Sequence, residues 1–407
     1  MSARTLATLR SGSFALLVLG VLAGRAAAQE RVFVRPEPGT PVVAVQVVVG
    51  VGPADEPAAQ AGISYLAARS VVEPSRAAFD SLGAHLDVDQ QKDAIAFTLT
   101  AAPDAWAEAT RLLMVSLFRD PVDSASVVRQ RAAIVRELTA REASPADALE
   151  RERARAVYGA EHPWGRPAVG TATSVRAVRV SQVDAFLRQN FTPERSVVAV
   201  VGPVDEAEAR DALAPHMPAG ELRADSVPPP QPADSTVDAE YNSITTWVSA
   251  TWRFGPDSDV EALRMLAQLA LDRVSFGPSR RSVYNSRAEV VRYAGGGELR
   301  LTLVVPPREA AQWAVQLREA VGGYAAEPLS PAVFQDRLRR FRGERLMELD
   351  LPEQRAAAMA RSALLGDRTA TLVDFTRLTP ERLRDAAGGL QPPIIVYLGP
   401  ARSQGGG

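Results

Sequence analysis

Two short segments with the same pattern, one in each half of the chain, restrict the fold more than any other feature. Residues 196–203 read SVVAVVGP and residues 393–400 read PIIVYLGP. Each is an apolar, β-branched run closed by Gly-Pro, which predicts a buried strand ending in a turn. Each follows the start of an amphipathic helix, with a capping box at Ser181 in the first copy and Thr379-Pro380 in the second. A helix followed by a strand, occurring twice, indicates two copies of one α/β unit.

A proline-rich segment lies between the two copies. Residues 226–235 read SVPPPQPADS, and this density of proline excludes the interior of a helix or strand. A surface loop within one domain would look similar, but the resemblance of the two flanks favours a linker. The length of 407 residues suits two domains of fewer than about 200 residues each. We predict an N-terminal domain over 29–222, a linker over 223–237, a C-terminal domain over 238–401 and a disordered tail over 402–407.

The remaining segments alternate between strand and helix patterns. Apolar runs predict strands over 42–51, 94–100, 245–254 and 298–305, and longer periodic segments predict helices over 104–119, 127–143, 145–158, 261–274, 308–324 and 331–349. The three glycines at 295–297 predict a hairpin turn before the strand at 298–305. Strands broken up by runs of helix indicate an α+β fold.

The first thirty residues have the order of a secretory signal. Arg4 and Arg10 form a positive start, residues 14–23 read FALLVLGVLA, and Ala26-Ala27-Ala28 supply small residues for cleavage. A membrane anchor is the alternative, but the apolar run is shorter than the roughly 20 residues that span a bilayer core. We therefore expect a signal peptide over 1–28 and a periplasmic or secreted protein. No later stretch predicts a membrane span.

Composition excludes several functions. The net charge of −2 argues against a nucleic-acid binder, which would show a basic excess. The absence of cysteine excludes disulfides, thiolate metal sites and cysteine nucleophiles, and it fits an oxidising compartment. Lys92 is the only lysine, which we interpret as compositional bias rather than function.

Between Arg131 and Gly202 the residues match a known family. The fragments AAIVREL, HPWGRP, VGT, NFTPER and VVAVVG follow one another in that order. In this series the chain resembles the pitrilysin, or insulinase-like (M16), metallopeptidases, which include the mitochondrial processing peptidases. The resemblance covers nearly all of the chain after the signal peptide. It implies an α+β clamshell half of two homologous domains, each a mainly antiparallel sheet with helices on one face.

The same resemblance implies an inverted zinc motif, H-x-x-E-H, with a second glutamate further along the chain. The aligned segment, residues 62–69, reads GISYLAAR, so the two histidine positions hold Tyr65 and Arg69 and the general-base position holds Ala68. Only the downstream ligand has a counterpart, Glu137. The chain has three histidines, His85, His162 and His216, and no two lie close enough in sequence to form the motif in any register. We therefore expect no zinc or other cofactor and no metal ligands.

Two further expectations concern the degenerate site. Arg69 could form a salt bridge with Glu137, because a carboxylate without its metal needs a partner when it is buried; alternatively, Glu137 lies on a solvated helix face. Relatives with activity carry an arginine and a tyrosine four residues apart that hold substrate. Here Arg287 matches the arginine, as a substrate-holding remnant, and Val291 replaces the tyrosine.

These residues predict a protein that keeps the fold of the M16 family and has lost its peptidase activity. The interpretation we favour is a non-catalytic subunit that binds extended peptides by strand addition or completes a chamber with an active M16 zinc-peptidase partner. The alternatives are an active zinc peptidase with unusual ligands and an envelope scaffold without peptide binding. The sequence does not specify the peptide or the partner.

Overall fold

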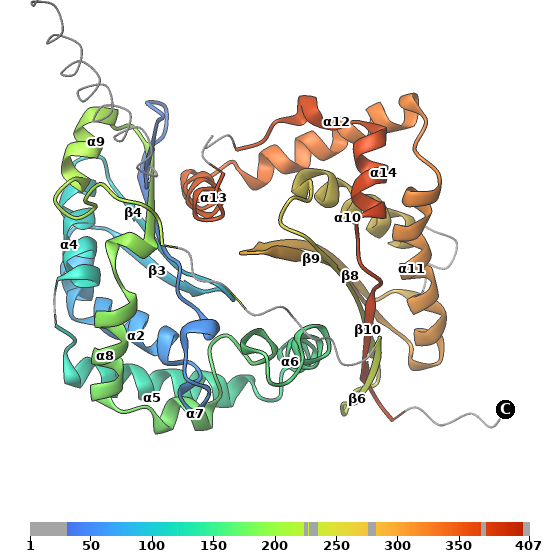
Figure 1. Cartoon of the computed structure of the whole chain (residues 1–407), viewed down its shortest axis with the longest axis horizontal. Helices are drawn as coiled ribbons and strands as arrows, with labels where there is room; N and C mark the ends of the chain where they lie inside the picture. The colour runs from blue at the N-terminus through green and yellow to red at the C-terminus, as the bar shows by residue number, and fades with distance from the viewer. Residues whose placement is uncertain are drawn as a thin grey trace, which may run out of the picture.

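The computed structural model describes residues 31–119, 121–223, 227, 235–275, 282–367 and 372–401. These residues form two sheets that stand side by side, each with its own helices (Figure 1). The predicted signal peptide, most of the proline-rich segment and the tail lie outside the described residues. In the described part of the chain, no helix is both long enough and apolar enough to cross a bilayer.

The first sheet has five strands in the order β1-β5-β2-β4-β3. β1 and β5 are parallel, and the other neighbouring pairs are antiparallel. The strands are β1 (Val32–Pro36), β2 (Val43–Val49), β3 (His85–Gln90), β4 (Ile95–Ala101) and β5 (Ser196–Gly202). The helices in this half are α2 (Ile63–Val72), α3 (Arg76–Ser81), α4 (Trp106–Phe118), α5 (Ser124–Arg141), α6 (Pro145–Tyr158), α7 (Ala172–Ala177), α8 (Val180–Asn190) and α9 (Glu206–Leu213).

The second sheet repeats the first. Its order is β6-β10-β7-β9-β8, with β6 and β10 parallel and the other pairs antiparallel. The strands are β6 (Thr236–Glu240), β7 (Thr246–Phe254), β8 (Asn285–Tyr293), β9 (Gly296–Val305) and β10 (Ile394–Gly399), and the helices are α10 (Val260–Ser275), α11 (Ala310–Ala326), α12 (Pro331–Glu348), α13 (Pro352–Leu364) and α14 (Pro380–Gly388). The prediction that both halves share one strand order is confirmed, as is the mainly antiparallel α+β fold.

One predicted boundary is wrong by two residues. We placed the end of the linker at Val237, but Thr236 and Val237 already belong to β6, where they pair with Ile395 and Val396. Sequence alone could not place this strand start, because a short edge strand of mixed polar and apolar residues has no strong pattern.

The two Gly-Pro endings have the same structural role in the two sheets. Gly202 ends β5, and its carbonyl accepts a hydrogen bond from the Glu37 amide just after β1. Gly399 ends β10, and its carbonyl accepts from the Tyr241 amide just after β6. A Cβ on Gly202 would lie 2.8 Å from the Val42 carbonyl oxygen, so this close approach of backbones requires glycine.

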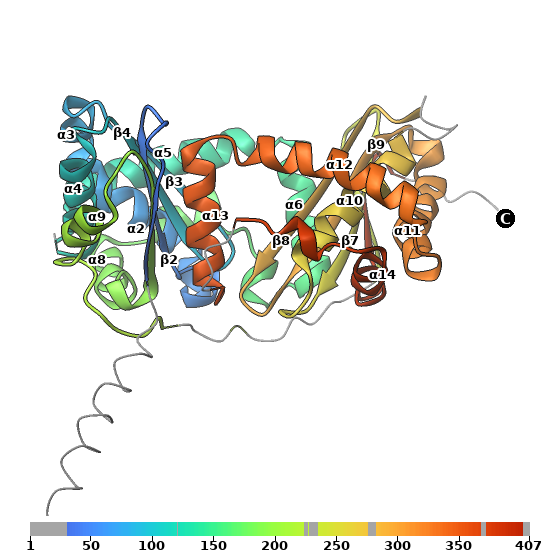
Figure 2. The ribbon, with the colours of Figure 1, turned by 90° about the horizontal axis from the view of Figure 1, so that it is seen from above.

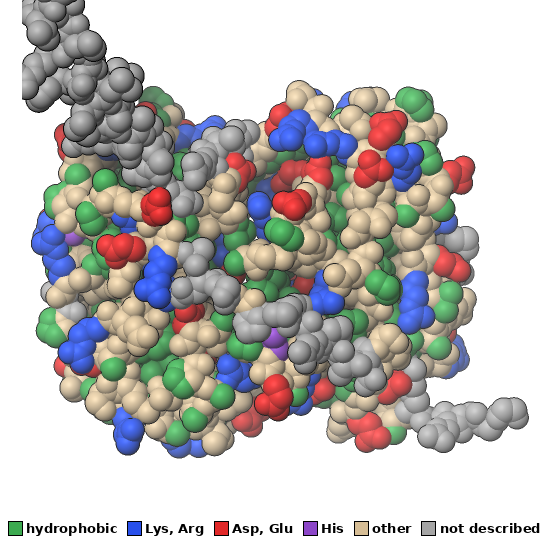
Figure 3. Space-filling model, viewed as in Figure 1, with side chains coloured by type: hydrophobic (Ala, Val, Ile, Leu, Met, Phe, Trp, Pro, Cys, Tyr) green, Lys and Arg blue, Asp and Glu red, His purple; other side chains and the backbone are tan. Residues whose placement is uncertain are grey.

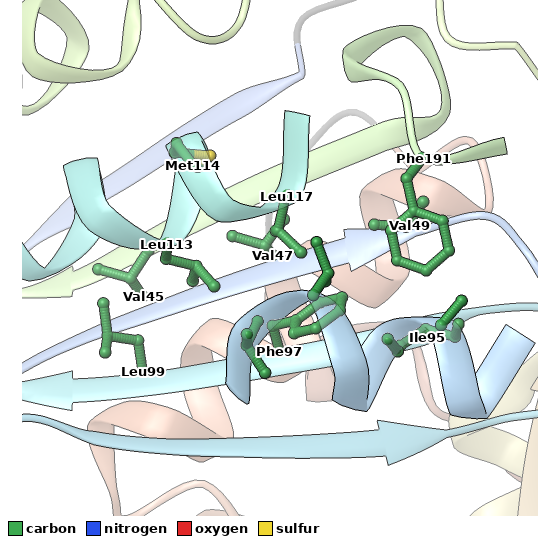
Figure 4. Packing of buried hydrophobic residues seen from close by; sticks show 14 of the residues in the cluster. Val45, Val47, Val49, Ile95, Phe97, Leu99, Leu113, Met114, Leu117 and Phe191 are labelled. Atoms are coloured by element: carbon green, nitrogen blue, oxygen red, sulfur yellow. The ribbon is translucent and has the colours of Figure 1, made fainter. Parts of the chain in front are cut away.

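The hydrophobic core of the first half follows the two-residue period of its strands. Figure 4 shows alternate residues of β2 and β4 packing against α4, in a set that includes Val45, Val47, Val49, Ile95, Phe97, Leu99, Leu113, Met114 and Leu117. The intervening residues, such as Ala44 and Val48, point to the opposite face. All seven residues of β2 are buried, so both faces of this sheet are covered.

The second covering layer of each sheet comes from the other half of the chain. α13, far along in the sequence, packs on the first sheet through Ala356, Met359, Ala360 and Ala363. α6, from the first half, packs through Val157 and Tyr158 against residues of β10 on the second sheet. Figure 2 shows α12 leading across the molecule to α13. The expectation of helices on one face is therefore incomplete, because each sheet also carries one exchanged helix on its other face.

Candidate functional site

α2 carries Tyr65, Ala68 and Arg69, the positions that the resemblance aligns with the inverted zinc motif. Its first turn is fixed by the buried carboxylate of Glu56, which accepts hydrogen bonds from the amides of Gly62 at 2.9 Å and Ser64 at 3.1 Å. Burial raises the pKa of Glu56, and its bonds with Ser64 and Gly62 act against this rise. Tyr65 and Arg69 lie one turn apart on α2 and so share one face of the helix.

Arg69 forms an ion pair with Glu137, the residue predicted to match the downstream metal ligand. Its Nη1 lies 2.6 Å from Oε2 of Glu137, which α5 carries beside α2. The same Nη1 lies 3.4 Å from the hydroxyl of Tyr65. Burial acts to lower the pKa of Arg69, but contact with Glu137 and Tyr65 outweighs it and raises that pKa. Of the two arrangements left open for Glu137, the structure has the salt bridge, with the Glu137 side chain about half exposed.

This group of side chains does not fit a zinc ion. A zinc site needs three or four neutral imidazole or anionic ligands, and Arg69 brings a fixed positive charge to a ligand position. Ala68, at the general-base position, is fully buried in the core of the first half. Within the described ranges, no three side chains of His, Cys, Asp or Glu cluster in a way that could hold a metal.

The three histidines lie apart from α2, each in a structural setting. His85 is exposed on β3, with its Nε2 2.9 Å from Asp87. His162 accepts a hydrogen bond from the Trp164 amide at Nδ1 and packs against the Trp164 ring, so it supports the loop that contains both residues. His216 lies buried in a turn after α9.

An open sheet edge lies next to α2. Among the described residues, β3 is the last strand of the first sheet and pairs on one side only, with β4. Ser64 Oγ, in the first turn of α2, lies 3.1 Å from Oε1 of Gln90 at the end of β3. Leu86 and Val88 pack toward the core, whereas the exposed His85, Asp87 and Asp89 face the side on which α13 lies. Such an edge offers unpaired backbone groups to an incoming strand.

The predicted substrate-holding remnant lies on the corresponding edge of the second sheet. Arg287 and Val291 are on β8, which pairs only with β9. Arg287 is largely exposed, with its Nη2 2.6 Å from Glu289. Val291 is half-buried and packs toward α6. Residues 287, 289 and 291 are spaced two apart along the strand, so their side chains share one face of the sheet.

Sequence reasoning missed a buried ionic cluster between the two halves. Glu298 of β9, at 1% exposure, lies 3.4 Å from Lys92 Nζ, 3.3 Å from Arg153 Nη1 and 2.6 Å from Arg300 Nε. The Tyr158 hydroxyl also donates to Glu298. Lys92 lies over the Tyr158 ring, 4.2 Å from its centroid. The interpretation of the single lysine as compositional bias alone is thus incomplete.

Burial and the neighbouring charges shift the pKa values of the residues in this cluster. Burial would raise the pKa of Glu298, but Arg300, Lys92 and Arg153 outweigh it and hold that pKa below its usual range. Burial lowers the pKa of Lys92 to about 8, and Glu298 only partly offsets this shift. The one signal in the sequence was a charged pair, Glu298 and Arg300, within an otherwise apolar strand.

Comparison with known sequences connects the chain to zinc proteases. It is 30% identical over 221 residues to an uncharacterised zinc protease of Mycobacterium leprae, which is 51% of this chain and 48% of that protein. It is 21% identical over 193 residues to an uncharacterised zinc protease of Bacillus subtilis, covering 44% of this chain and 46% of that protein. The chain thus matches about half the length of these curated relatives. No family model matches the sequence.

Comparison with solved structures shows the fold over almost the whole chain. A peptidase M16 inactive domain from Pseudomonas fluorescens has a TM-score of 0.79 at 17% identity, covering 93% of this chain and 98% of that one. A protease from Helicobacter pylori has a TM-score of 0.77 at 15% identity, covering 92% and 98%. A chain of complex III2 from Candida albicans has a TM-score of 0.76 at 13% identity, covering 90% and 93%.

Proposed function

Because the chain is M16-like in fold and is related in sequence to zinc proteases, we propose that it is an exported, non-catalytic M16-like subunit. In this role it binds extended peptides, or completes a chamber with an active zinc-peptidase partner, outside the cytoplasm. The observation that carries the proposal is the Arg69–Glu137 ion pair, 2.6 Å long, where the family has its zinc ligands. A guanidinium held there by a carboxylate leaves neither a metal site nor a base to activate water.

Peptide binding is supported by the free edge of β3. An extended peptide can add to such an edge through main-chain hydrogen bonds, without using a metal. The outward row of β3 contains Asp87 and Asp89, both exposed, so side chains of an added strand would meet negative charge. The edge adjoins α2 through the Ser64–Gln90 contact, so a peptide added to β3 would lie beside the helix that carries Tyr65 and Arg69.

A partner subunit is supported by what the chain has kept. The two sheets, their cores and the exchanged helices are complete, whereas the substitutions fall on Tyr65, Ala68, Arg69 and Val291. A neighbour in fold is itself described as an inactive M16 domain, and another is a chain of a larger complex. A specific contact with a partner should bury at least about 1,000 Å² in total.

Metal content and peptidase assays test the loss of catalysis. The purified protein should contain no stoichiometric zinc and should show no chelator-sensitive cleavage of a mixed peptide library. Stoichiometric zinc with cleavage would instead support an active peptidase with unusual ligands. A peptide-binding assay on the same preparation separates the proposal from an envelope scaffold, which would bind none of the library.

Co-expression tests the partner. The chain is produced with a homologue that has an intact H-x-x-E-H motif, and the mixture is analysed by size-exclusion chromatography with light scattering. A joint peak, or a change in the homologue's cleavage rate, is expected. Two separate monomer peaks at micromolar concentration with an unchanged rate would refute the assembly.

A further inference from the structure

A cavity of about 530 Å³ lies between α13 and the second half of the molecule, away from α2. Its walls come from the start of α10, from α12 and α13, and from the segment that leads into α14. Figure 3 shows basic and acidic side chains side by side at the upper end of the seam between the two halves. The volume falls within the range of about 300–1,000 Å³ that is typical of small-molecule sites. The nineteen side chains that line it include six arginines.

Glu261 and Asp259, two of the five acidic residues in the lining, form ion pairs with lining arginines. Glu261 serves two of the arginines, with Arg264 Nη1 at 3.0 Å and Arg345 Nε at 3.3 Å. Asp259 is bound by Arg382 at 3.2 Å. Burial lowers the pKa of Arg264, and the nearby Arg345 lowers it further, while Glu261 acts in the opposite direction. These contacts occupy the carboxylates of Glu261 and Asp259.

Three arginines of the lining have donors without a partner among the described residues, but only the Nη1 of Arg361 is buried, since Arg377 is exposed and Arg292 is half-buried. Arg361 uses Nη2 to bind Asp93 at 2.6 Å and the carbonyl of Arg292 at 2.7 Å, but its buried Nη1 has no partner. Arg292 and Arg377 line the same cavity, and neither side chain has a hydrogen bond or an ion pair with a described residue. Two lining carboxylates are exposed: Asp257, and Asp374, which accepts hydrogen bonds from the Thr376 amide and hydroxyl. The bonds from Thr376, and to a smaller extent the charges of Arg377 and Arg382, lower the pKa of Asp374. Buried donors almost always have partners, so the missing acceptor is expected to come from a ligand.

We propose that this cavity binds a small oxyanion with two or more carboxylate or phosphate oxygens. Arg361 Nη1, Arg292 and Arg377 supply the donors, and guanidinium groups match the geometry of carboxylate and phosphate. The ligand would contact Arg361 of α13, which is fixed on the first sheet, and Arg292 and Arg377 of the second half. It would therefore link the two halves, and its binding is independent of the peptide edge at β3.

The test is calorimetric titration of the full-length protein with citrate and with inorganic phosphate, at constant ionic strength set by sodium chloride. The informative variants are Arg377→Gln and Arg292→Gln, because neither side chain has a bond in the described fold whose loss would unfold the protein. The matched control is Arg308→Gln, another arginine at 85% exposure and outside the cavity. A peptide with a free C-terminal carboxylate and its amidated form show whether the oxyanion belongs to a free molecule or to a peptide end.

Saturable binding of at least one of these anions to a single site is expected. Arg377→Gln and Arg292→Gln should each weaken it about tenfold or more, the effect of losing one charge-assisted hydrogen bond. Arg308→Gln should bind as the natural protein does. Either of two results overturns the proposal: no saturable binding of citrate, phosphate or the carboxylate-ended peptide at millimolar concentration, or equal affinity for all variants.

Discussion

The substitution Glu298→Gln should remove the main electrostatic connection between the two halves. The change keeps the size and the hydrogen-bonding outline of the side chain and deletes its charge. Lys92 and Arg153 come from the first half and Arg300 from the second, and all three lie within 3.4 Å of the carboxylate. The site is buried, since Glu298 is 1% exposed. Without the negative charge of Glu298, the three cations repel one another there.

The size of the effect follows from distance and burial. At an effective dielectric constant of about 20, two unit charges about 3.3 Å apart attract each other by about 5 kcal/mol. Removing the charge also removes the free-energy cost of desolvating the carboxylate, and this gain offsets part of the lost attraction. Removing one partner of a buried ion pair typically costs about 3–5 kcal/mol, and we expect a loss in that range. This is a large fraction of the total stability of a folded domain, about 5–15 kcal/mol.

Urea denaturation followed by circular dichroism and tryptophan fluorescence measures the loss. Trp164 reports on the seam directly, because its ring centroid is 5.3 Å from that of Tyr293 next to the cluster. The matched control is Asp184→Asn, which makes the same isosteric change in an exposed pair with Arg188 at 2.6 Å and should cost less than about 1 kcal/mol. Equal, small losses in both variants would show that the reasoning about the cluster is wrong.

Two further predictions concern ionisation and metal binding. Because burial lowers the pKa of Lys92 from 10.5 to about 8, the folded protein loses this proton before the unfolded chain does. The free energy of unfolding should therefore rise by up to about 3 kcal/mol between pH 8 and pH 10.5, and Lys92→Met should abolish that part of the rise in urea midpoints. The combined substitutions Tyr65→His, Ala68→Glu and Arg69→His should free Glu137 and create stoichiometric zinc binding, measured by metal analysis after dialysis. A triple variant that folds but binds no zinc would mean that α2 is aligned in the wrong register.

The two repeated strand endings could be predicted from the sequence, because a buried strand shows as a short apolar run with a clear end. Two apolar runs closed by Gly-Pro predicted two copies of one unit, and both copies end a central strand at the same place in equivalent sheets. The packing of α13 and α6 on the sheet of the other half could not be predicted from the sequence. α13 has a short apolar face of small residues, and nothing in its own sequence indicates which sheet it covers, because that choice depends on where α12 directs it.

The sequence by itself determined that no inverted zinc motif can exist here. That conclusion depends only on residue identity and spacing, and three scattered histidines leave no register to test. The tertiary structure decided what occupies the positions aligned with the motif, an ion pair between Arg69 of α2 and Glu137 of α5, two residues 68 apart in sequence. It also decided that Lys92 and Glu298 meet and that Arg292, Arg361 and Arg377 line one cavity. Such features arise from side chains on separate elements, and local patterns carry no information about which distant charges the fold brings together.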